Sequence, residues 1–269
     1  MTMKKRKAIF TYARNEALYF PLWIKHHLKS FSKEDVYVLD NDTCDGSIED
    51  AINMGFLLRE NVLPISCTGF FSSQWLNDQA SEFQHHLLSM YEWVVLAEVD
   101  ELIAINPNHY ENWDTFLNAF EKTGKNYCRA LGHDVVHNME KEPSIDLEKP
   151  ILSQRSNVRV WRPELNNGRM LFSKPILSKI PVKWSAGGHH IKENDVRLKV
   201  DIEEALLLFH LNMFDFNLCA QRRLERVPSG QQQIDGDRLW VGQKLIDEMN
   251  EYLSHSATTK IPHEFTQIF

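Results

Sequence analysis

The stretch Trp93–Glu101 (WVVLAEVDE) runs from five apolar residues directly into an acidic cluster. An apolar run of this length is typical of a strand that is buried on both faces, as in a parallel sheet. Glu98 and Asp100 then follow the carboxyl end of that strand and, two positions apart, project from one side of an extended chain. Such a pair can hold a hard divalent cation such as Mg²⁺ or Mn²⁺. An acidic strand exit that only stays in contact with water is the plainer alternative.

Strand and helix patterns alternate upstream of this stretch. The sequence predicts strands over 8–12, 36–39 and 56–58, and helices over 19–31, 48–54 and 73–90. Alternating elements of this kind predict an α/β fold, a Rossmann-type, mainly parallel sheet flanked by helices. Ligands of such sheets bind beyond the carboxyl ends of the strands. We therefore expect three strand-end segments to meet in one crevice: Tyr12–Glu16, Asp40–Asp45 and Glu98–Glu101.

The pattern changes beyond residue 122, where a mixed α+β half is predicted. Short strands are predicted over 126–131, 158–161, 170–172, 176–182 and 205–209, and helices over 217–226 and 238–253. The sequence contains no internal repeat, low-complexity tract or clear linker. We therefore predict one domain over residues 1–269 with two halves, 1–122 and 123–269.

The net charge and the cysteine content limit the partners and the compartment that the sequence predicts. The chain has 269 residues and a formal net charge of 30 − 37 = −7, so nucleic acid is not an expected partner. An acidic protein that handles a phosphorylated ligand needs a metal ion or local basic groups. The four cysteines are widely spaced and predict free thiols in a reducing cytosol: Cys44, Cys67, Cys128 and Cys219.

No membrane-spanning run or signal peptide is recognisable in the sequence. The basic N-terminal tip, Lys4–Lys7, leaves peripheral contact with an anionic membrane surface open beside a plain cytoplasmic location.

Polar residues follow the first two predicted strands. Asp40, Asn41 and the turn formers up to Ser47 either form a turn that caps the next helix or accept hydrogen bonds from a base and ribose. Arg14 and Glu16 form either an exposed charge pair at a helix start or contacts to a diphosphate and a nucleoside. The pattern alone leaves both pairs of alternatives open.

Three histidines are candidates for chemistry. His189 and His190 follow two glycines, which allow close backbone approach to a ligand, and histidine is the commonest general acid or base. A hairpin turn with surface histidines is the alternative. His210 comes directly after five apolar residues and is either a core histidine or a metal or diphosphate ligand at a strand end.

Taken together, these residues resemble the bacterial family 2-like glycosyltransferases, which have the GT-A fold. The matching segments follow the same order along most of the chain: 13–16 with Trp23 and His26–His27, 37–42 with 45–47, 93–102, 173–175, 184–189 and 206–211. The resemblance implies transfer of a sugar from a nucleotide-sugar donor, most simply a UDP-sugar, to a hydroxyl of a glycan or lipid-linked saccharide. It also implies Mg²⁺ or Mn²⁺ as cofactor, and assembly of a surface polysaccharide or lipopolysaccharide as the pathway.

The resemblance also assigns roles. It makes 1–122 the nucleotide-binding half and 123–269 the acceptor-binding half. Donor contacts fall to Arg14, Glu16, Asp40, Asn41 and Glu98. Metal ligands are Asp100, Glu98 and His210, in the manner of an Asp-x-Asp motif whose first position is here a glutamate. An acceptor hydroxyl must lose its proton during attack, and the candidate bases are His189, His190 and Glu101, with Asp134 a weaker choice.

Two other functions are compatible with the same residues. A metal-dependent nucleotidyltransferase also needs a carboxylate pair and a nucleotide crevice, although no basic glycine-rich loop follows the first strand. A non-catalytic module would bind a nucleotide or sugar without turning it over. The sequence does not specify an oligomeric state.

Overall fold

The computed structural model of the chain describes residues 3–66, 72–225 and 243–266. Its contacts divide it into two compact units. The first unit comprises Met1–Ala130 and Lys174–Leu206, and the second comprises Leu131–Ser173 and Leu207–Phe269. Two long strands, β6 (Tyr127–Val136) and β12 (Ile202–Met213), contribute residues to both. Within the described ranges, no helix is both long and apolar enough to cross a bilayer.

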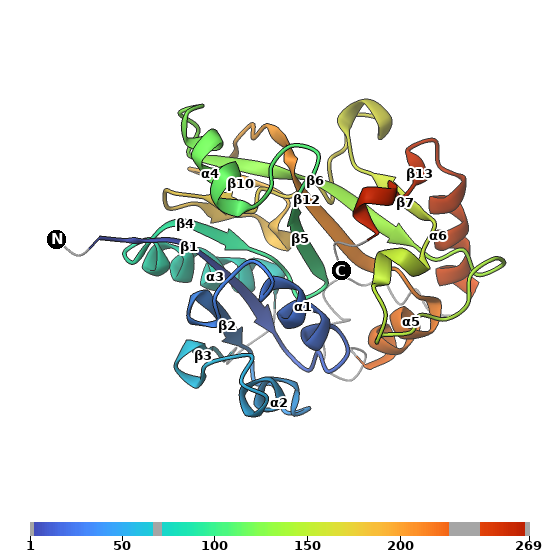
Figure 1. Cartoon of the computed structure of the whole chain (residues 1–269), viewed down its shortest axis with the longest axis horizontal. Coiled ribbons are helices and arrows are strands. Elements are labelled where there is room, and N and C mark those ends of the chain that lie inside the picture. The colour runs from blue at the N-terminus through green and yellow to red at the C-terminus, as the bar shows by residue number, and fades with distance from the viewer. Residues whose placement is uncertain (1–2, 67–71, 226–242, 267–269) are drawn as a thin grey trace. The chain divides into compact units, whose positions relative to one another are not determined.

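Four parallel strands form the centre of the first unit. They are ordered β3 (Val62–Pro64), β2 (Val36–Asp40), β1 (Lys5–Ala13) and β4 (Tyr91–Leu96) (Figure 1). The short strand β8 (Leu177–Ser178) pairs antiparallel with β4, and a small antiparallel sheet contains β9 (Lys183–Trp184), β10 (Ile191–Glu193) and β11 (Val196–Arg197). The predicted α/β class, with its mainly parallel sheet, is confirmed.

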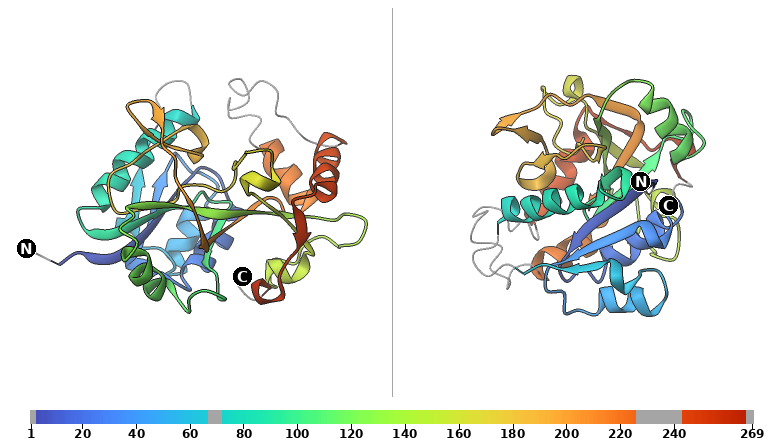
Figure 2. Two further views of the ribbon diagram at one scale, coloured as in Figure 1. Left: turned by 90° about the horizontal axis from the view of Figure 1, so that it is seen from above. Right: turned by 90° about the vertical axis from the view of Figure 1, so that its left-hand side faces the viewer.

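Helices cover both faces of the parallel strands because their residues alternate between two apolar surfaces. On one face lies α3 (Ser73–Leu87) (Figure 2). Its Phe83 and Leu87 join the cluster that includes Phe10 and Val94. On the other face, Trp93 meets Phe120 of α4 (Trp113–Glu121) with ring centroids 5.6 Å apart. Helix α1 (Tyr19–His27) packs against β5 (Glu101–Ile105), where Nε2 of the buried His26 donates to the carbonyl of Ile103 at 2.8 Å. The strand ends are thereby held by a core on each side.

The second unit is built on an antiparallel ladder of β6, β7 (Asn157–Val160) and β13 (Thr258–Lys260), with helices α5 (Phe216–Glu225) and α6 (Gln243–Ser254). A fully buried ion pair joins Arg155 Nη2 to Asp215 Oδ2 at 2.9 Å. Asp215 also accepts from the backbone N–H of Ile145, which fixes the polar 138–150 segment to the start of α5. The expected mixed α+β character of this part of the chain is therefore present.

Two predicted strands are wrong, and a third is shorter than predicted. Residues 56–58 instead follow α2 (Ser47–Asn53), where Gly55 has a φ of 75° and Phe56 N–H closes the helix end on the carbonyl of Ala51. Residues 170–172 enter a turn, because Ser173 N–H donates to the carbonyl of Met170. Only Leu177–Ser178 of the predicted 176–182 strand is extended and paired. Apolar content alone did not separate buried loops from strands.

Helix limits also differ from prediction. Helix α1 ends at His27, and α3 is capped by Ser72, whose hydroxyl accepts from the N–H of Trp75. Residues 238–242 of the predicted last helix, and Cys67, lie outside the described residues. The assignment of donor and acceptor binding to the two halves of the chain stays a prediction.

Candidate functional site

The carboxyl ends of β1, β2 and β4 lie side by side in the first unit. Ala13 is in register with Asp40, and Phe10 with Leu96. Strands in a sheet are spaced by about 4.8 Å and rise by about 3.3 Å per residue, so the ends of β2 and β4, with β1 between them and an offset of three residues, are roughly 14 Å apart. The register of the sheet therefore brings the three predicted strand-end segments to the same edge of the sheet.

The loop after β2 is held in a fixed shape by its own polar groups. Asp40 Oδ1 accepts from the backbone N–H of Thr43 at 2.9 Å, and Asp42 has a φ of 57°. Asp45 accepts from the N–H and hydroxyl of Ser47 and also from the N–H of Ala17 at 2.8 Å. Asp45 therefore ties the loop after β2 to the loop after β1.

Asn41 is 2% exposed, and its Oδ1 atom has no hydrogen-bond partner among the described residues. An unsatisfied buried acceptor costs about 1–3 kcal/mol. A ligand N–H or hydroxyl that reaches this atom would remove the cost.

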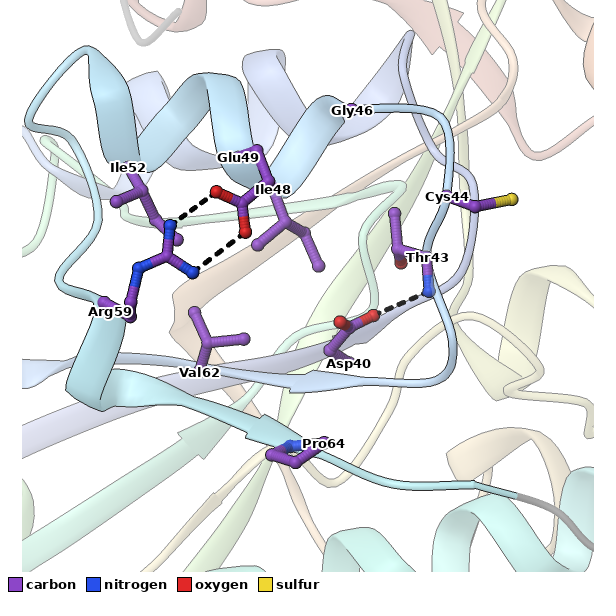
Figure 3. A pocket seen from close by; sticks show the side chains of 10 residues that line it. All are labelled: Asp40, Thr43, Cys44, Gly46, Ile48, Glu49, Ile52, Arg59, Val62 and Pro64. Carbon is purple, nitrogen blue, oxygen red and sulfur yellow. Dashed lines mark hydrogen bonds and ion pairs between the residues drawn. The ribbon is translucent and has the colours of Figure 1, made fainter.

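A pocket of about 370 Å³ opens beside Asp40, between α2 and the end of β3 (Figure 3). Its walls combine apolar side chains with one charged pair, in which Arg59 donates two hydrogen bonds to Glu49. The remaining lining residues are Thr43, Cys44, Gly46, Ile48, Ile52, Val62 and Pro64. A volume of this size accommodates a small planar ligand.

The acidic cluster after β4 is a turn and not a continuation of the strand, which corrects the expected geometry. Strand β4 ends at Leu96, Glu101 N–H donates to the carbonyl of Glu98 at 2.8 Å, and β5 begins at Glu101. Glu101 Oε2 accepts from the N–H of Glu98 at 3.0 Å. Glu98 and Asp100 are therefore positioned by the turn, which Glu101 closes with its own side chain.

Lys174 lies against this turn. Its Nζ is 2.7 Å from both Glu98 Oε1 and Glu101 Oε1, and its side chain is 5% exposed. Burial acts to lower the pKa of Lys174, but the charges of Glu101 and Glu98 outweigh it and raise that pKa. Lys174 is therefore a charged, buried cation that neutralises one of the three formal negative charges of the turn.

Tyr12, the penultimate residue of β1, completes the cluster. Burial, followed by the charges of Glu98 and Glu101, raises the pKa of the Tyr12 phenol well above its ordinary value. Its hydroxyl hydrogen-bonds to Glu98, and the charge of Asp100 also acts on it. Tyr12 therefore stays protonated and can only donate to the carboxylates.

The residues around the turn suit a divalent ion that shares its ligands with a substrate. Among residues 3–66, 72–225 and 243–266, no group of three or more His, Cys, Asp or Glu side chains is arranged to hold a metal ion. Glu98 is occupied by Lys174 and Tyr12. Mg²⁺ is commonly held by one or two carboxylates together with phosphates and water, and Asp100 beside Glu98 supplies that donor set.

The Gly187–Gly188 loop approaches the same turn. Both glycines have positive φ, 70° and 67°. A β-carbon on Gly188 would stand 3.4 Å from Glu98 Oε1 and 3.7 Å from Asn77 Oδ1. The loop is held on α3, because Gln74 accepts from the N–H of Ala186 at 3.0 Å. A β-carbon at these distances would make only ordinary van der Waals contacts, so the positive φ, and not a lack of space, favours glycine at position 188.

The two predicted histidines belong to this loop. The carbonyl of His189 accepts from Arg129 at 3.0 Å. Burial, followed by the charges of Arg129 and Arg197, lowers the pKa of His190. His190 is therefore a neutral imidazole near neutral pH, which is the form that a general base requires.

The remaining predicted residues lie in the segment between β1 and α1 and in the second unit. Glu16 is buried at the start of α1, and its carbonyl accepts from the N–H of Phe20. Arg14 is partly exposed in the loop after β1. His210 belongs to β12 in the second unit, where its Nδ1 lies 2.6 Å from Asp134 Oδ1. Roles for Arg14 and Glu16 in donor binding, and for His210 in metal binding, stay predictions.

Sequence reasoning assigned no role to three residues of the cluster. Tyr12 and Lys174 lay within segments that had been noted, but their contacts with Glu98 depend on tertiary structure. Asn77 is 1% exposed, and its Oδ1 atom has no hydrogen-bond partner within the described residues. The sequence signal that could have singled out Asn77 is a polar residue inside a predicted helix with an apolar stripe.

A scan against models of protein families finds no match for this chain, and no curated protein matches its sequence. Several solved structures are similar in fold. TarS (1-349) from S. aureus is 13% identical over 93% of this chain and 72% of its own, with a TM-score of 0.38. GalNAc-T7 with UDP, GalNAc and Mn²⁺ is 9% identical over 94% of this chain and 57% of its own, with a TM-score of 0.46.

The mannosyltransferase PcManGT from Pyrobaculum calidifontis, in complex with GDP-Man and Mn²⁺, is 15% identical. It covers 51% of this chain and 37% of its own length, with a TM-score of 0.32. Glycosyltransferases, the class that the sequence resembles, are thus found among the solved structures similar to this chain.

Proposed function

We propose that this chain is a glycosyltransferase that moves a sugar from a nucleotide-sugar donor, most simply a UDP-sugar, to a hydroxyl of a glycan or lipid-linked acceptor. The observation that carries the proposal is the pairing of two features at the ends of β2 and β4, the two strands that flank β1. A pocket of about 370 Å³ lies beside Asp40 after β2, and an acidic turn follows β4. Both lie at the carboxyl-end edge of one parallel sheet, so one donor can place its nucleoside in the pocket and its diphosphate at the turn.

The nucleoside end of the donor occupies the pocket. Asp40 and the unsatisfied Oδ1 of Asn41 are acceptors for base N–H and ribose hydroxyl groups, and the loop that carries them is fixed by Asp45. Arg14 and Glu16, on the neighbouring loop, are the further donor contacts of the proposal. Asp45 itself is structural, because its oxygens are already used.

The charge of the turn supports a divalent cofactor. Three carboxylates and one lysine leave a formal charge of −2, which repels a diphosphate unless a cation intervenes. Mg²⁺ or Mn²⁺ at Asp100, with Glu98 beside it, would supply Lewis-acid stabilisation of the leaving diphosphate. Lys174 and Tyr12 keep Glu98 in place.

The transfer needs one proton acceptor. As the acceptor hydroxyl oxygen bonds to the anomeric carbon, the bond from that carbon to the phosphate oxygen breaks and the hydroxyl proton leaves. His190 is the favoured base because it is neutral, and His189 is its neighbour in the same loop. Glu101 is less suited, since its carboxylate is held by Lys174 and by the N–H of Glu98.

Thermal shift with a panel of nucleotide sugars, with Mn²⁺ or with chelator, tests donor binding. A ligand at a hundred times its Kd stabilises the folded state by about 2.7 kcal/mol. We expect one nucleotide class to stabilise the protein in Mn²⁺ and to be hydrolysed slowly to nucleoside diphosphate and free sugar. Asp100→Asn should abolish the hydrolysis, whereas Asp114→Asn, a surface carboxylate paired with Lys7, should not change it.

Three outcomes would refute parts of this proposal. Stabilisation by nucleoside triphosphates with release of pyrophosphate would identify a nucleotidyltransferase. Donor binding with no turnover in any condition would identify a binding module. Full turnover after chelation would remove the metal from the mechanism and leave the transfer in place.

A further inference from the structure

An ion pair lines the pocket beside Asp40. Glu49 lies in the first turn of α2, and Arg59 lies in the turn Arg59–Asn61 that precedes β3. Arg59 Nη1 donates to Glu49 Oε1 at 2.9 Å, and Arg59 Nη2 donates to Glu49 Oε2. These hydrogen bonds lower the pKa of Glu49 and raise the pKa of Arg59, so both groups stay charged. The pair and the rest of the pocket lining belong to the first unit.

The pair adds little to the stability of the fold. The side chains of Arg59 and Glu49 are 63% and 56% exposed, and ion pairs in such contact with water contribute little to the free energy of folding. The two hydrogen bonds use one N–H of each terminal guanidinium nitrogen and one lone pair of each carboxylate oxygen. A second N–H and a second lone pair therefore lie next to each other at the edge of the pair, where they can bind a ligand.

The pocket combines this polar pair with apolar walls. Figure 3 shows the pair and Asp40 on different sides of the pocket, with Ile48 and Val62 between them. Aliphatic side chains pack well on the face of a planar ring, whereas the polar edge of such a ring needs hydrogen-bonding partners. A nucleoside meets both conditions, with its ribose hydroxyls at Asp40 and the edge of its base at the pair.

We propose that Arg59 and Glu49 read the hydrogen-bonding edge of the nucleobase and so determine which nucleotide the chain binds. This assignment rests on the proposed function, which puts the nucleoside of the donor in this pocket. Uracil offers a carbonyl oxygen beside a ring N–H, so Arg59 donates to the oxygen and Glu49 accepts from the N–H. Both contacts use the N–H and the lone pair that the ion pair itself leaves over.

Cytosine presents the opposite order on the same ring. Its amino group is a donor where uracil has an oxygen, and its ring nitrogen is an acceptor where uracil has an N–H. In the orientation of uracil, the amino group would face Arg59 and the ring nitrogen would face Glu49, which sets donor against donor and acceptor against acceptor. Guanine shares the order of uracil, and adenine shares the order of cytosine. The pair therefore favours UDP and GDP over CDP and ADP.

Titration calorimetry of the full chain with UDP and with CDP, in the presence of Mn²⁺, tests this assignment. The two ligands differ only at the edge of the base, so the ratio of their Kd values cancels the contacts to ribose and phosphates. We expect wild type to bind UDP about 10- to 100-fold more tightly than CDP, and Arg59→Met and Glu49→Gln to bring the ratio toward unity. GDP and ADP give the same comparison for purines.

A double variant separates reading of the base from a structural role. Glu49→Arg combined with Arg59→Glu keeps an ion pair between α2 and the turn before β3 but reverses the order of donor and acceptor. It should unfold at the same temperature as wild type and favour CDP over UDP. Lys125→Met removes another exposed ion pair and should leave the ratio unchanged.

Two results would overturn the assignment. One is a wild-type ratio near unity or in favour of CDP and ADP, and the other is a ratio that the double variant leaves unchanged. Either result, with nucleotide binding intact, would leave the proposed function in place. If none of these nucleoside diphosphates binds, the proposed function fails together with the assignment.

Discussion

Replacing Lys174 with methionine keeps most of the side-chain volume and removes its charge. Lys174 is 5% exposed and pairs at 2.7 Å with Glu101, which is 1% exposed, and with Glu98, which is 22% exposed. Removing one partner of a buried ion pair typically costs about 3–5 kcal/mol, because a charge is left without compensation. Most of that cost falls on Glu101, since Glu98 retains partial contact with water.

Equilibrium urea unfolding at pH 8 measures this loss. Lys125→Met is the matched control, because Lys125 pairs with Asp201 at 3.1 Å on the surface, where the two side chains are 44% and 60% exposed. An exposed pair of that kind contributes about 0–1 kcal/mol. We therefore expect Lys174→Met to lower the free energy of unfolding several times more than Lys125→Met.

The pH dependence of the free energy of unfolding gives a second, independent test of the prediction. In the wild type the pKa of Lys174 is raised, so its stabilisation is complete below the unfolded value of 10.5 and is lost only as pH rises past the folded value. Between about pH 5 and 8 that contribution is constant. In Lys174→Met the buried carboxyl has no cation, so burial makes it take up a proton more readily as pH falls. The difference in the free energy of unfolding between wild type and Lys174→Met should therefore be smaller at pH 5 than at pH 8.

A loss in Lys174→Met no larger than that in Lys125→Met would refute the assignment of a desolvated cation to the acidic turn. A large loss that is equal at both pH values would refute the role of Glu101 as the uncompensated charge.

Three further predictions follow from contacts in the two units. Asp45→Ala removes the hydrogen bonds that join two strand-end loops, so it should cost about 1–3 kcal/mol in urea unfolding and weaken nucleotide-sugar binding in thermal shift. Arg155→Met leaves the carboxylate of Asp215 buried without its cation and should cost about 3–5 kcal/mol in the same unfolding measurement, whereas a loss below 1 kcal/mol would contradict the pair. Burial lowers the pKa of His26 to about 4, so the unfolded chain takes up a proton first as pH falls below 6.5. Stability should then drop by up to about 1.4 kcal/mol per pH unit, a slope that His26→Gln should reduce.

The sequence predicted where the acidic residues lie but not how they are held. The apolar run before Glu98 made a buried strand and its carboxyl end predictable, and alternation upstream made the neighbouring ends predictable too. The ion pair of Glu98 could not be predicted, because its partner is a lysine 76 positions away in sequence. Local patterns contain no information about such pairing.

The pair in the second unit was beyond prediction for the same reason. Asp134 and His210 are also 76 positions apart, and each lies just beyond a predicted strand, over 126–131 and 205–209. The pattern therefore did not predict a buried partner for Asp134. The identity of that partner depends on which strands become neighbours.

The pocket beside Asp40 also provides a labelling site. Cys44 is exposed at its edge, and in Figure 3 its sulfur points away from the other lining side chains, whereas Cys128 and Cys219 are buried. In a Cys67→Ser background, which removes the cysteine outside the described residues, an environment-sensitive fluorophore on Cys44 would sit next to any bound ligand. Ligand occupancy would then become an optical signal, and donors could be screened before any acceptor is known.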